Sequence, residues 1–259
     1  MPKVLLLREK RQFVPELNKE VVTTKARRWL VYDITKDFST AYGVLTKKQL
    51  KSKDGSVLKT STGKELVIFT ASFPDMFARW KKLPQAMMFK DLGVIAAETG
   101  MNKESTVLDA GTGSGAAACF FAQICKKVVT YDQREDYQAL AKTNAELVHA
   151  KNIVFKHGDV YEKIPEKNMD VILLDVPEPW HSIEHVAKAL KIGGWFVSFS
   201  PTIPQVQECC NSLDKNPHFL VAKTIEINER LWKVKGRAVR PVSGDVGHTG
   251  FLTFARRIT

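Results

Sequence analysis

Three glycines and two hydroxyl residues form a short loop between an apolar run and a helical pattern. The loop is Gly111-Thr112-Gly113-Ser114-Gly115, and Ala116 follows it. Glycines at such a turn let the backbone approach a ligand closely, with free amides at the start of the next helix. With Ala116, the loop also fits the dinucleotide-binding pattern G-x-G-x-x-G/A. The loop therefore predicts a nucleotide-type cofactor, and a tight strand–helix turn without a ligand is the alternative.

Four aspartates stand at the ends of four predicted strands. Along the chain they are Asp109, Asp132, Asp159 and Asp175. Ligands of parallel α/β sheets bind at the carboxyl ends of the strands, so we expect these carboxylates to line one crevice. Any one of them is explained equally well as a helix cap, but four caps at four strand ends are a weaker explanation.

These carboxylates suit different parts of a cofactor. Asp132, at the end of the second strand, is placed to accept hydrogen bonds from ribose hydroxyls. Asp159 can accept one from an adenine amine, and Asp109 can meet a cationic amino end or orient the loop. NAD enzymes share the ribose-binding acid, so an NAD-dependent dehydrogenase is an alternative. The sequence has no evident His and Arg pair for hydride transfer.

The pattern from residue 105 onward positions these groups. Apolar strands that alternate with helices indicate a mostly parallel sheet covered on both faces, an α/β doubly wound fold. The last two strands have no helix between them, which predicts an antiparallel pair joined by a long loop. Strands are expected at 106–110, 127–132, 152–156, 169–175, 194–199, 219–227 and 248–256, and helices at 135–148 and 184–190.

Three segments follow from these patterns. Residues 1–72 show short alternating runs and an Asp54-Gly55 turn, typical of a small antiparallel β-domain. Residues 73–104 predict a helical bridge, with one helix over 74–80 that Pro84 interrupts and another that ends near Gly100. Residues 105–259 form the predicted catalytic domain of seven strands.

Composition limits the class of protein. The 259 residues are 44% hydrophobic and 26% charged, an ordinary balance for a globular protein. No apolar run reaches 18 residues, so we expect no membrane span, and the four cysteines lack metal-ligand spacing, so we expect no metal. The start of the sequence shows no evident signal peptide, and the cysteines are expected in helices and cores, which favours a cytoplasmic location. A net charge of +11 is compatible with a nucleic-acid partner.

Several motifs resemble the TrmI family of tRNA adenine-N1 methyltransferases, which act on T-loop adenine 58 and in archaea also 57. The resemblance covers about residues 75–258. Its most specific parts are Asp175-Val176-Pro177-Glu178-Pro179-Trp180 and the tail Gly247-His248-Thr249-Gly250-Phe251-Leu252. The family motif Gln-x-x-Tyr-Pro-Lys-Asp is matched at Gln85, Lys90 and Asp91, whereas Met88 stands where the family often has an aromatic ring.

The resemblance implies a cofactor, a substrate and an assembly. The cofactor is S-adenosylmethionine, the partner is tRNA, and family members are typically homotetramers. Asp132 would contact the ribose and Asp159 the adenine of the cofactor. The expected cofactor-binding residues are Gln85, Asp109, Gly111, Thr112, Gly113, Ser114, Gly115, Ala116, Asp132, Asp159 and Asp175.

The chemistry of methyl transfer to adenine N1 singles out one catalytic candidate. The nitrogen lone pair needs alignment more than activation, and methylation leaves positive charge on the base. A carboxylate that accepts from the N6 amine stabilises that charge, and Asp175 is the candidate. A purely structural carboxylate is the alternative. Trp180 is assigned equally to the wall of the base pocket or to packing, and His248 to a structural hydrogen bond.

Basic clusters predict how RNA would be held. They are 8–11, 25–28, 47–53 and 230–237, with Arg240 beyond. Phosphate contacts of this kind give affinity without sequence choice and weaken with salt. A solvated basic face is the alternative. Two other functions stay open: a methyltransferase for protein or a small molecule, and a non-catalytic RNA-binding subunit of a two-subunit enzyme.

Overall fold

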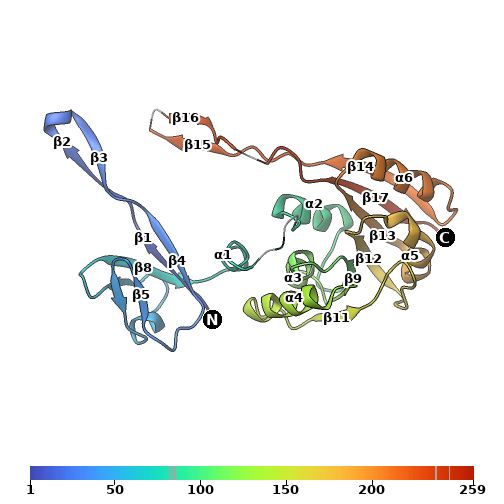
Figure 1. Cartoon of the computed structure of the whole chain (residues 1–259), viewed down its shortest axis with the longest axis horizontal. Helices are drawn as coiled ribbons and strands as arrows, with labels where there is room; N and C mark the ends of the chain where they lie inside the picture. Colours follow the sequence, from blue (N-terminus) through green and yellow to red (C-terminus); the bar gives the residue numbers. More distant parts are fainter. Residues whose placement is uncertain (82, 84–85, 237, 245) are drawn as a thin grey trace. The chain divides into compact units, whose positions relative to one another are not determined.

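The chain folds into two compact units, Met1–Trp80 and Lys81–Thr259, in a computed structural model (Figure 1). The structure describes residues 1–81, 83, 86–236, 238–244 and 246–259. Three predicted positions therefore lie outside the described residues: Pro84, Gln85 and Arg237 of the basic cluster 230–237.

The first unit is an antiparallel β-structure, as its alternating pattern indicates. Its four-stranded sheet has the order β4-β1-β8-β7. The strands of this sheet are β1 (Lys3–Leu7), β4 (Arg27–Val31), β7 (Val57–Lys59) and β8 (Glu65–Thr70). Two further hairpins pair β2 (Lys10–Val14) with β3 (Lys19–Thr24), and β5 (Phe38–Thr40) with β6 (Gly43–Leu45). Buried aliphatic side chains such as Leu5, Leu66 and Ile68 form a separate core.

Short helical segments complete the first unit. They are η1 (Pro15–Leu17), η2 (Gln49–Lys51) and α1 (Phe73–Phe77). The Asp54-Gly55 turn leads from η2 into β7 rather than joining two strands of a hairpin. Gly55 donates its amide to the carbonyl of Ile68, which aligns the following residues with β8. Helix α1 begins with a capping box between Ser72 and Asp75 and is shorter than predicted.

The second unit contains the predicted sheet of seven strands, in the order β11-β10-β9-β12-β13-β17-β14. The strands are β9 (Thr106–Ala110), β10 (Lys127–Asp132), β11 (Ile153–His157), β12 (Met169–Leu174), β13 (Leu190–Ser200), β14 (Phe219–Glu226) and β17 (Phe251–Arg257). The first five are parallel, and β17 pairs antiparallel with both β13 and β14. The predicted doubly wound fold with an antiparallel last pair is confirmed.

Helices cover both faces of this sheet because strand residues alternate between them. Leu108, Ile172 and Phe196 pack in one core with residues of α5 and α6. Their neighbours Val107 and Val171 pack in a second core with residues of α2 and α3. The helices are α2 (Phe89–Thr99), α3 (Ala116–Ala122), α4 (Glu135–Leu147), α5 (Ile183–Ala189) and α6 (Ile203–Asp214), with η3 at Pro179–Ser182. Among the described residues, every helix is too short or too polar to cross a bilayer.

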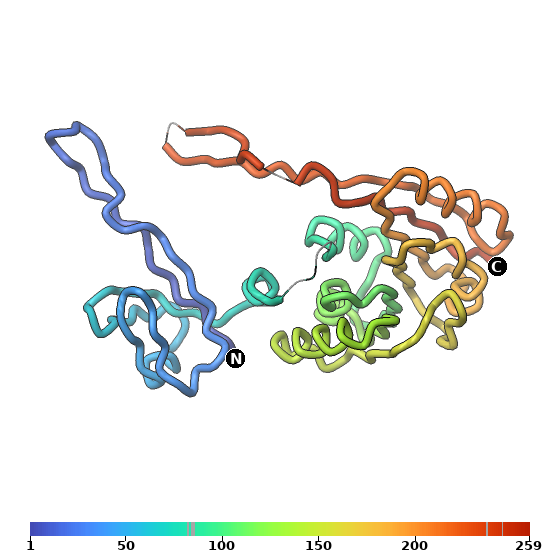
Figure 2. Tube along the Cα trace, viewed as in Figure 1, coloured from blue at the N-terminus to red at the C-terminus, as the bar shows by residue number. Residues whose placement is uncertain are grey.

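The segment between β14 and β17 is not the plain loop that the sequence pattern predicted. It contains a hairpin of β15 (Trp232–Lys235) and β16 (Ala238–Pro241). Figure 2 shows it in orange and red, as an extended double run that leaves the sheet and returns. The alternation of apolar and basic residues over 232–235 is the period-2 signal of a strand.

Candidate active site

At two glycines of the loop, neighbouring residues lie too close for a side chain. Gly111 has φ +93°, and a Cβ there would lie 2.1 Å from the carbonyl oxygen of Asp175. Gly115 has φ +80°, and its Cβ would lie 3.0 Å from the Cβ of Ala141 on α4. A Cβ on Gly113 would meet nothing closer than 3.8 Å. The absence of a side chain at Gly111 and Gly115 thus permits close packing of the loop against Asp175 and α4. The absence of one at Gly113 instead leaves open space beside the loop.

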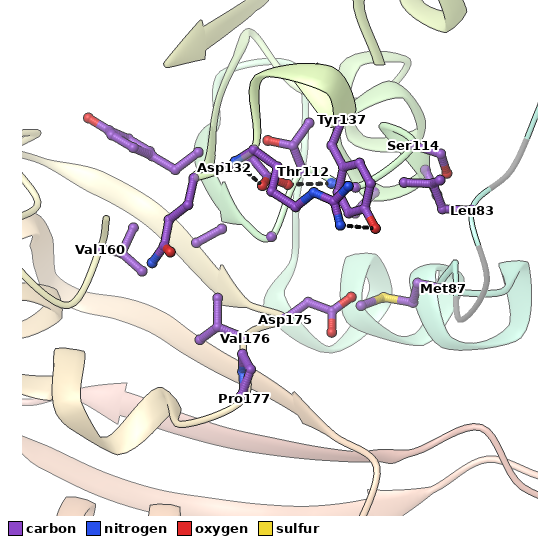
Figure 3. A pocket seen from close by; sticks show the side chains of 18 of the residues that line it. Leu83, Met87, Thr112, Ser114, Asp132, Tyr137, Val160, Asp175, Val176 and Pro177 are labelled. Carbon is purple, nitrogen blue, oxygen red and sulfur yellow. Dashed lines mark hydrogen bonds between the residues drawn. The ribbon is translucent and has the colours of Figure 1, made fainter. Parts of the chain in front are cut away.

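A cavity of about 490 Å³ lies at the carboxyl ends of β9, β10 and β12 (Figure 3). In Figure 3, Asp175 projects into it from the end of β12, across from Asp132 and Thr112. The predicted residues that line it are Gly111, Thr112, Gly113, Ser114, Ala116, Asp132, Asp159 and Asp175. Asp109 and Gly115 are not part of its lining.

Two of the lining carboxylates are held by backbone amides. Asp132 accepts from the amide of Gly113 through Oδ2 and from that of Arg134 through Oδ1, both at 2.9 Å. Asp159 accepts from the amide of Tyr161 at 2.7 Å. These contacts fix the orientation of the carboxylates, and each oxygen retains a lone pair for a ligand.

Asp109 lies beneath the loop rather than in the cavity. Its Oδ2 accepts from the hydroxyl of Thr130 at 2.7 Å, and the hydroxyls of Thr130 and Thr112 are also 2.7 Å apart. Its Oδ1 is buried without a partner among the described residues. Burial raises the pKa of Asp109 to about 7, although the bond from Thr130 opposes that effect. Asp109 thus anchors the loop to β10 through a chain of hydroxyls.

Asp175 is coupled electrostatically to Asp109. Its backbone amide donates to the carbonyl of Ala110 at 2.8 Å, which fixes the end of β12 against β9. Burial, and secondly the charge of Asp109, raise the pKa of Asp175 to about 7. The charge of Asp109 on the adjacent strand thus disfavours ionisation of Asp175, and the charge of Asp132 acts in the same way on Asp109.

Aromatic and apolar residues of the cavity were not predicted from the sequence. Tyr131 and Tyr161 line it, as does Tyr137 on the first turn of α4, whose ring lies 3.7 Å below the guanidinium carbon of Arg134. Tyr131 directly precedes Asp132, and that adjacency was the available signal. Trp180 is not in the lining and packs against the core beside α5 and α6.

The matched motif residues Lys90 and Asp91 form a buried network with the tail. Lys90 Nζ donates to Asp91 Oδ1 at 2.8 Å, to the carbonyl of Ile227 at 2.7 Å and to Thr249 Oγ1 at 2.6 Å. Thr249 donates to the other oxygen of Asp91 at 3.1 Å. All three ammonium donors are used, so this network joins the start of α2 to both sides of the β14–β17 connection. Met88 occupies the N-cap position of α2 and lies outside the cavity lining.

His248 forms a second contact across that connection. Its Nδ1 lies 2.6 Å from Glu226 Oε1, and its Nε2 lies 2.8 Å from the carbonyl of Pro201. The bond to Glu226 raises the pKa of His248. Both ring nitrogens are engaged within the fold, which is the arrangement of a structural histidine.

Comparison with known proteins decides the family. The model of the family described as "tRNA methyltransferase complex GCD14 subunit" matches residues 80–240. The chain belongs to this family. The match includes the glycine loop, all four aspartates and the β15 strand. Membership of the GCD14 family favours a methyltransferase over a dinucleotide-dependent dehydrogenase.

Individual relatives of this GCD14-family chain agree. It is 32% identical to the Methanocaldococcus jannaschii protein named tRNA (adenine(57)-N(1)/adenine(58)-N(1))-methyltransferase TrmI, over 92% of this chain and 94% of that one. The crystal structure of tRNA (m1A58) methyltransferase TrmI from Aquifex aeolicus superposes with a TM-score of 0.76 at 25% identity, covering 99% and 97% of the two chains. A Thermotoga maritima structure described as a SAM-dependent O-methyltransferase gives 0.77 at 28%, covering 99% and 93%.

Proposed function

We propose that this chain is an S-adenosylmethionine-dependent tRNA (adenine-N1)-methyltransferase that forms 1-methyladenosine in the T-loop. One observation carries the proposal: in a member of the GCD14 family, the glycine loop and three aspartates converge on one cavity at the carboxyl ends of parallel strands. The relatives' names supply adenine 58, with 57 as a second position.

The residues present suit S-adenosylmethionine. The cavity has the size of a cofactor site, and Gly113 leaves the loop open to close approach. Asp132 would accept from the ribose hydroxyls and Asp159 from the adenine amine. Asp109 would support the cofactor loop from beneath, through the hydroxyls of Thr130 and Thr112. When bound, the cofactor supplies an electrophilic methyl group on a sulfonium.

Asp175 would act on the target base. Its carboxylate accepts a hydrogen bond from the N6 amine, which orients N1 and balances the positive charge that methylation leaves on the ring. Alignment of this kind contributes on the order of 7–11 kcal/mol to barrier reduction. Because Asp175 lies in a poorly solvated site, its charge acts there more strongly than in water. The adenine must leave the folded T-loop to reach it, as bases do in other modifying enzymes.

Basic residues of both units would hold the tRNA. The first 80 residues contain 16 lysines and arginines against 8 aspartates and glutamates, so they carry +8 of the net +11. Such a surface attracts a polyanion in a salt-dependent way. We further expect a homo-oligomer, a tetramer by resemblance, working in the cytoplasm.

The deciding experiment is methylation of a defined RNA. Purified protein is incubated with labelled S-adenosylmethionine and unmodified tRNA transcripts, followed by nucleoside analysis. We expect 1-methyladenosine, lost when adenines 57 and 58 are both replaced. Asp175→Ala should lower turnover about 100- to 1,000-fold while changing cofactor affinity little.

Other outcomes would indicate the alternatives. Cofactor binding without any methylated RNA would favour a non-catalytic subunit, and label in protein or small molecules would favour another methyl acceptor. Calorimetric binding of NAD instead of S-adenosylmethionine would contradict the proposal altogether.

A further inference from the structure

We propose that the β15–β16 hairpin is an RNA clamp, whose basic face contacts tRNA phosphates beside the active-site cavity. The basic face is defined by Lys233, Lys235 and Arg240. This inference rests on the proposed function, because it names the element that holds the substrate. Three features of the structure carry it: the place of the hairpin, the separation of its two faces and the way its base is fixed.

The strand register places the base of the hairpin at the edge of the sheet that carries the cavity. The last residue of β13, Ser200, pairs with Phe251 of β17, which pairs with Glu226 at the end of β14. Strand β13 runs parallel to β12, so its end lies at the same edge as Asp175. The chain leaves the sheet after Glu226 and returns before Phe251. The hairpin therefore projects from the carboxyl edge (Figure 1).

The two faces of the hairpin differ in chemistry because side chains alternate along a strand. Lys233 stands directly opposite Arg240, whereas Val234 stands opposite Val239. Val234 and Val239 are 74% and 60% exposed. Among the described residues of β15 and β16, the charged side chains are therefore confined to one face of the ribbon.

Like charges directly opposed in a hairpin are destabilising, and an isolated two-stranded hairpin is marginally stable by itself. Among the described residues, no acid forms an ion pair with Lys233 or Arg240. Both side chains belong to exposed residues. A neighbouring polyanion removes this repulsion, because the phosphates of a nucleic-acid backbone bind adjacent cations together. Binding of a phosphate backbone would thus relieve a repulsion between Lys233 and Arg240 that persists when the hairpin is exposed to water alone.

The two segments that connect the hairpin to the sheet are anchored where they meet β14 and β17. Lys90 Nζ, on α2, donates to the carbonyl of Ile227 in the outgoing segment and to Thr249 Oγ1 in the returning segment. His248 bonds to Glu226 and to the carbonyl of Pro201, which follows β13. Phosphates bound to the basic face would therefore be held in a fixed orientation relative to the carboxyl edge of the sheet. Such contacts would orient the tRNA as well as attract it.

A charge reversal at Lys233 separates RNA binding from hairpin stability. Lys233→Glu places an acid opposite Arg240, so it replaces repulsion with attraction and leaves the hairpin no less stable. We expect tRNA affinity to fall about tenfold or more, and the salt dependence of binding to decrease by about one unit of log–log slope. The measurement is anisotropy titration of an unmodified tRNA transcript at several salt concentrations. Arg240→Glu should act in the same direction.

Lys215→Glu is the matched control, because Lys215 is an exposed lysine outside the hairpin. It changes the net charge equally and should leave tRNA affinity within about twofold of the wild type. Calorimetry with S-adenosylmethionine should give the same affinity in all the variants. Thermal unfolding should show no loss of stability in Lys233→Glu.

Equal tRNA affinity in Lys233→Glu, Arg240→Glu and Lys215→Glu would overturn the clamp and leave the proposed function intact. A changed molecular mass in light scattering, with affinity lost in parallel, would also overturn it and make the hairpin a subunit interface. If the wild type binds S-adenosylmethionine but no tRNA, the proposed function itself fails.

Discussion

At the scale of single residues, the carboxyl groups of Asp109 and Asp175 determine the electrostatics of the site, because burial makes the ionised form of each unfavourable. Asp109 is buried under the loop and Asp175 projects into the cavity, and the pKa of each is raised to about 7. Desolvation is the largest cause for both, and the second carboxyl adds to the effect on Asp175. Ionisation of Asp175 therefore takes place near neutral pH. The ionised carboxylate is the form that can balance the positive charge of the methylated base.

This coupling predicts a pH dependence of methyl transfer. Asp175 must be ionised to balance the charge on the base, so kcat/KM should rise with pH and level off above about 7. Asp109→Asn removes the neighbouring charge while retaining an acceptor for Thr130. The pKa of Asp175 should then fall, and the acid limb of the profile should move to lower pH. An unmoved limb would contradict electrostatic control by Asp109.

At the scale of elements, the glycine loop separates residues needed for the fold from those needed for the ligand. Gly111→Ala should destabilise the protein by about 3 kcal/mol, since its Cβ would collide with backbone of Asp175 at a strained positive φ. Gly113→Ala, with φ +52° and open surroundings, should cost about 1 kcal/mol. Its methyl group would instead lower cofactor affinity about tenfold.

Chemical unfolding and calorimetry with S-adenosylmethionine measure these two effects independently. Equal loss of stability in Gly111→Ala and Gly113→Ala would contradict the assignment of Gly111 to the fold and Gly113 to cofactor binding. Gly100, whose φ of +66° ends α2, offers a control for backbone strain outside the cavity.

The elements also show what sequence patterns can and cannot predict. Strands β9 and β10 were predicted to the residue, because both are apolar runs bounded by turn residues or charges. The site aspartates were found because parallel strands bring their carboxyl ends together. Asp109 was expected either to contact the cofactor or to orient the loop. It lies outside the cavity lining and accepts a hydrogen bond from Thr130, which agrees with the second alternative. The position of Tyr137 in the cavity lining was not predicted, because the direction in which its side chain points depends on how α4 packs against the sheet.

At the scale of the whole molecule, cofactor binding and most of the positive charge belong to different units. Every described residue that lines the cavity lies after residue 80, and that unit has two hydrophobic clusters of its own. The first 80 residues contain a separate core and carry +8, whereas residues 81–259 carry only +3 from 23 basic and 20 acidic residues. Long-range attraction of tRNA should therefore come chiefly from the first unit.

This separation predicts the properties of a fragment. Residues 81–259 alone should bind S-adenosylmethionine with an affinity within about threefold of the whole chain, because the cavity and its supporting cores are complete. The same fragment should bind tRNA more weakly and with a shallower salt dependence, since fewer phosphates are neutralised. Calorimetry and anisotropy titrations on both proteins measure these quantities. Full tRNA affinity in the fragment would place the binding surface on the second unit, whereas lost cofactor affinity in a folded fragment would show that the first unit supports the cavity.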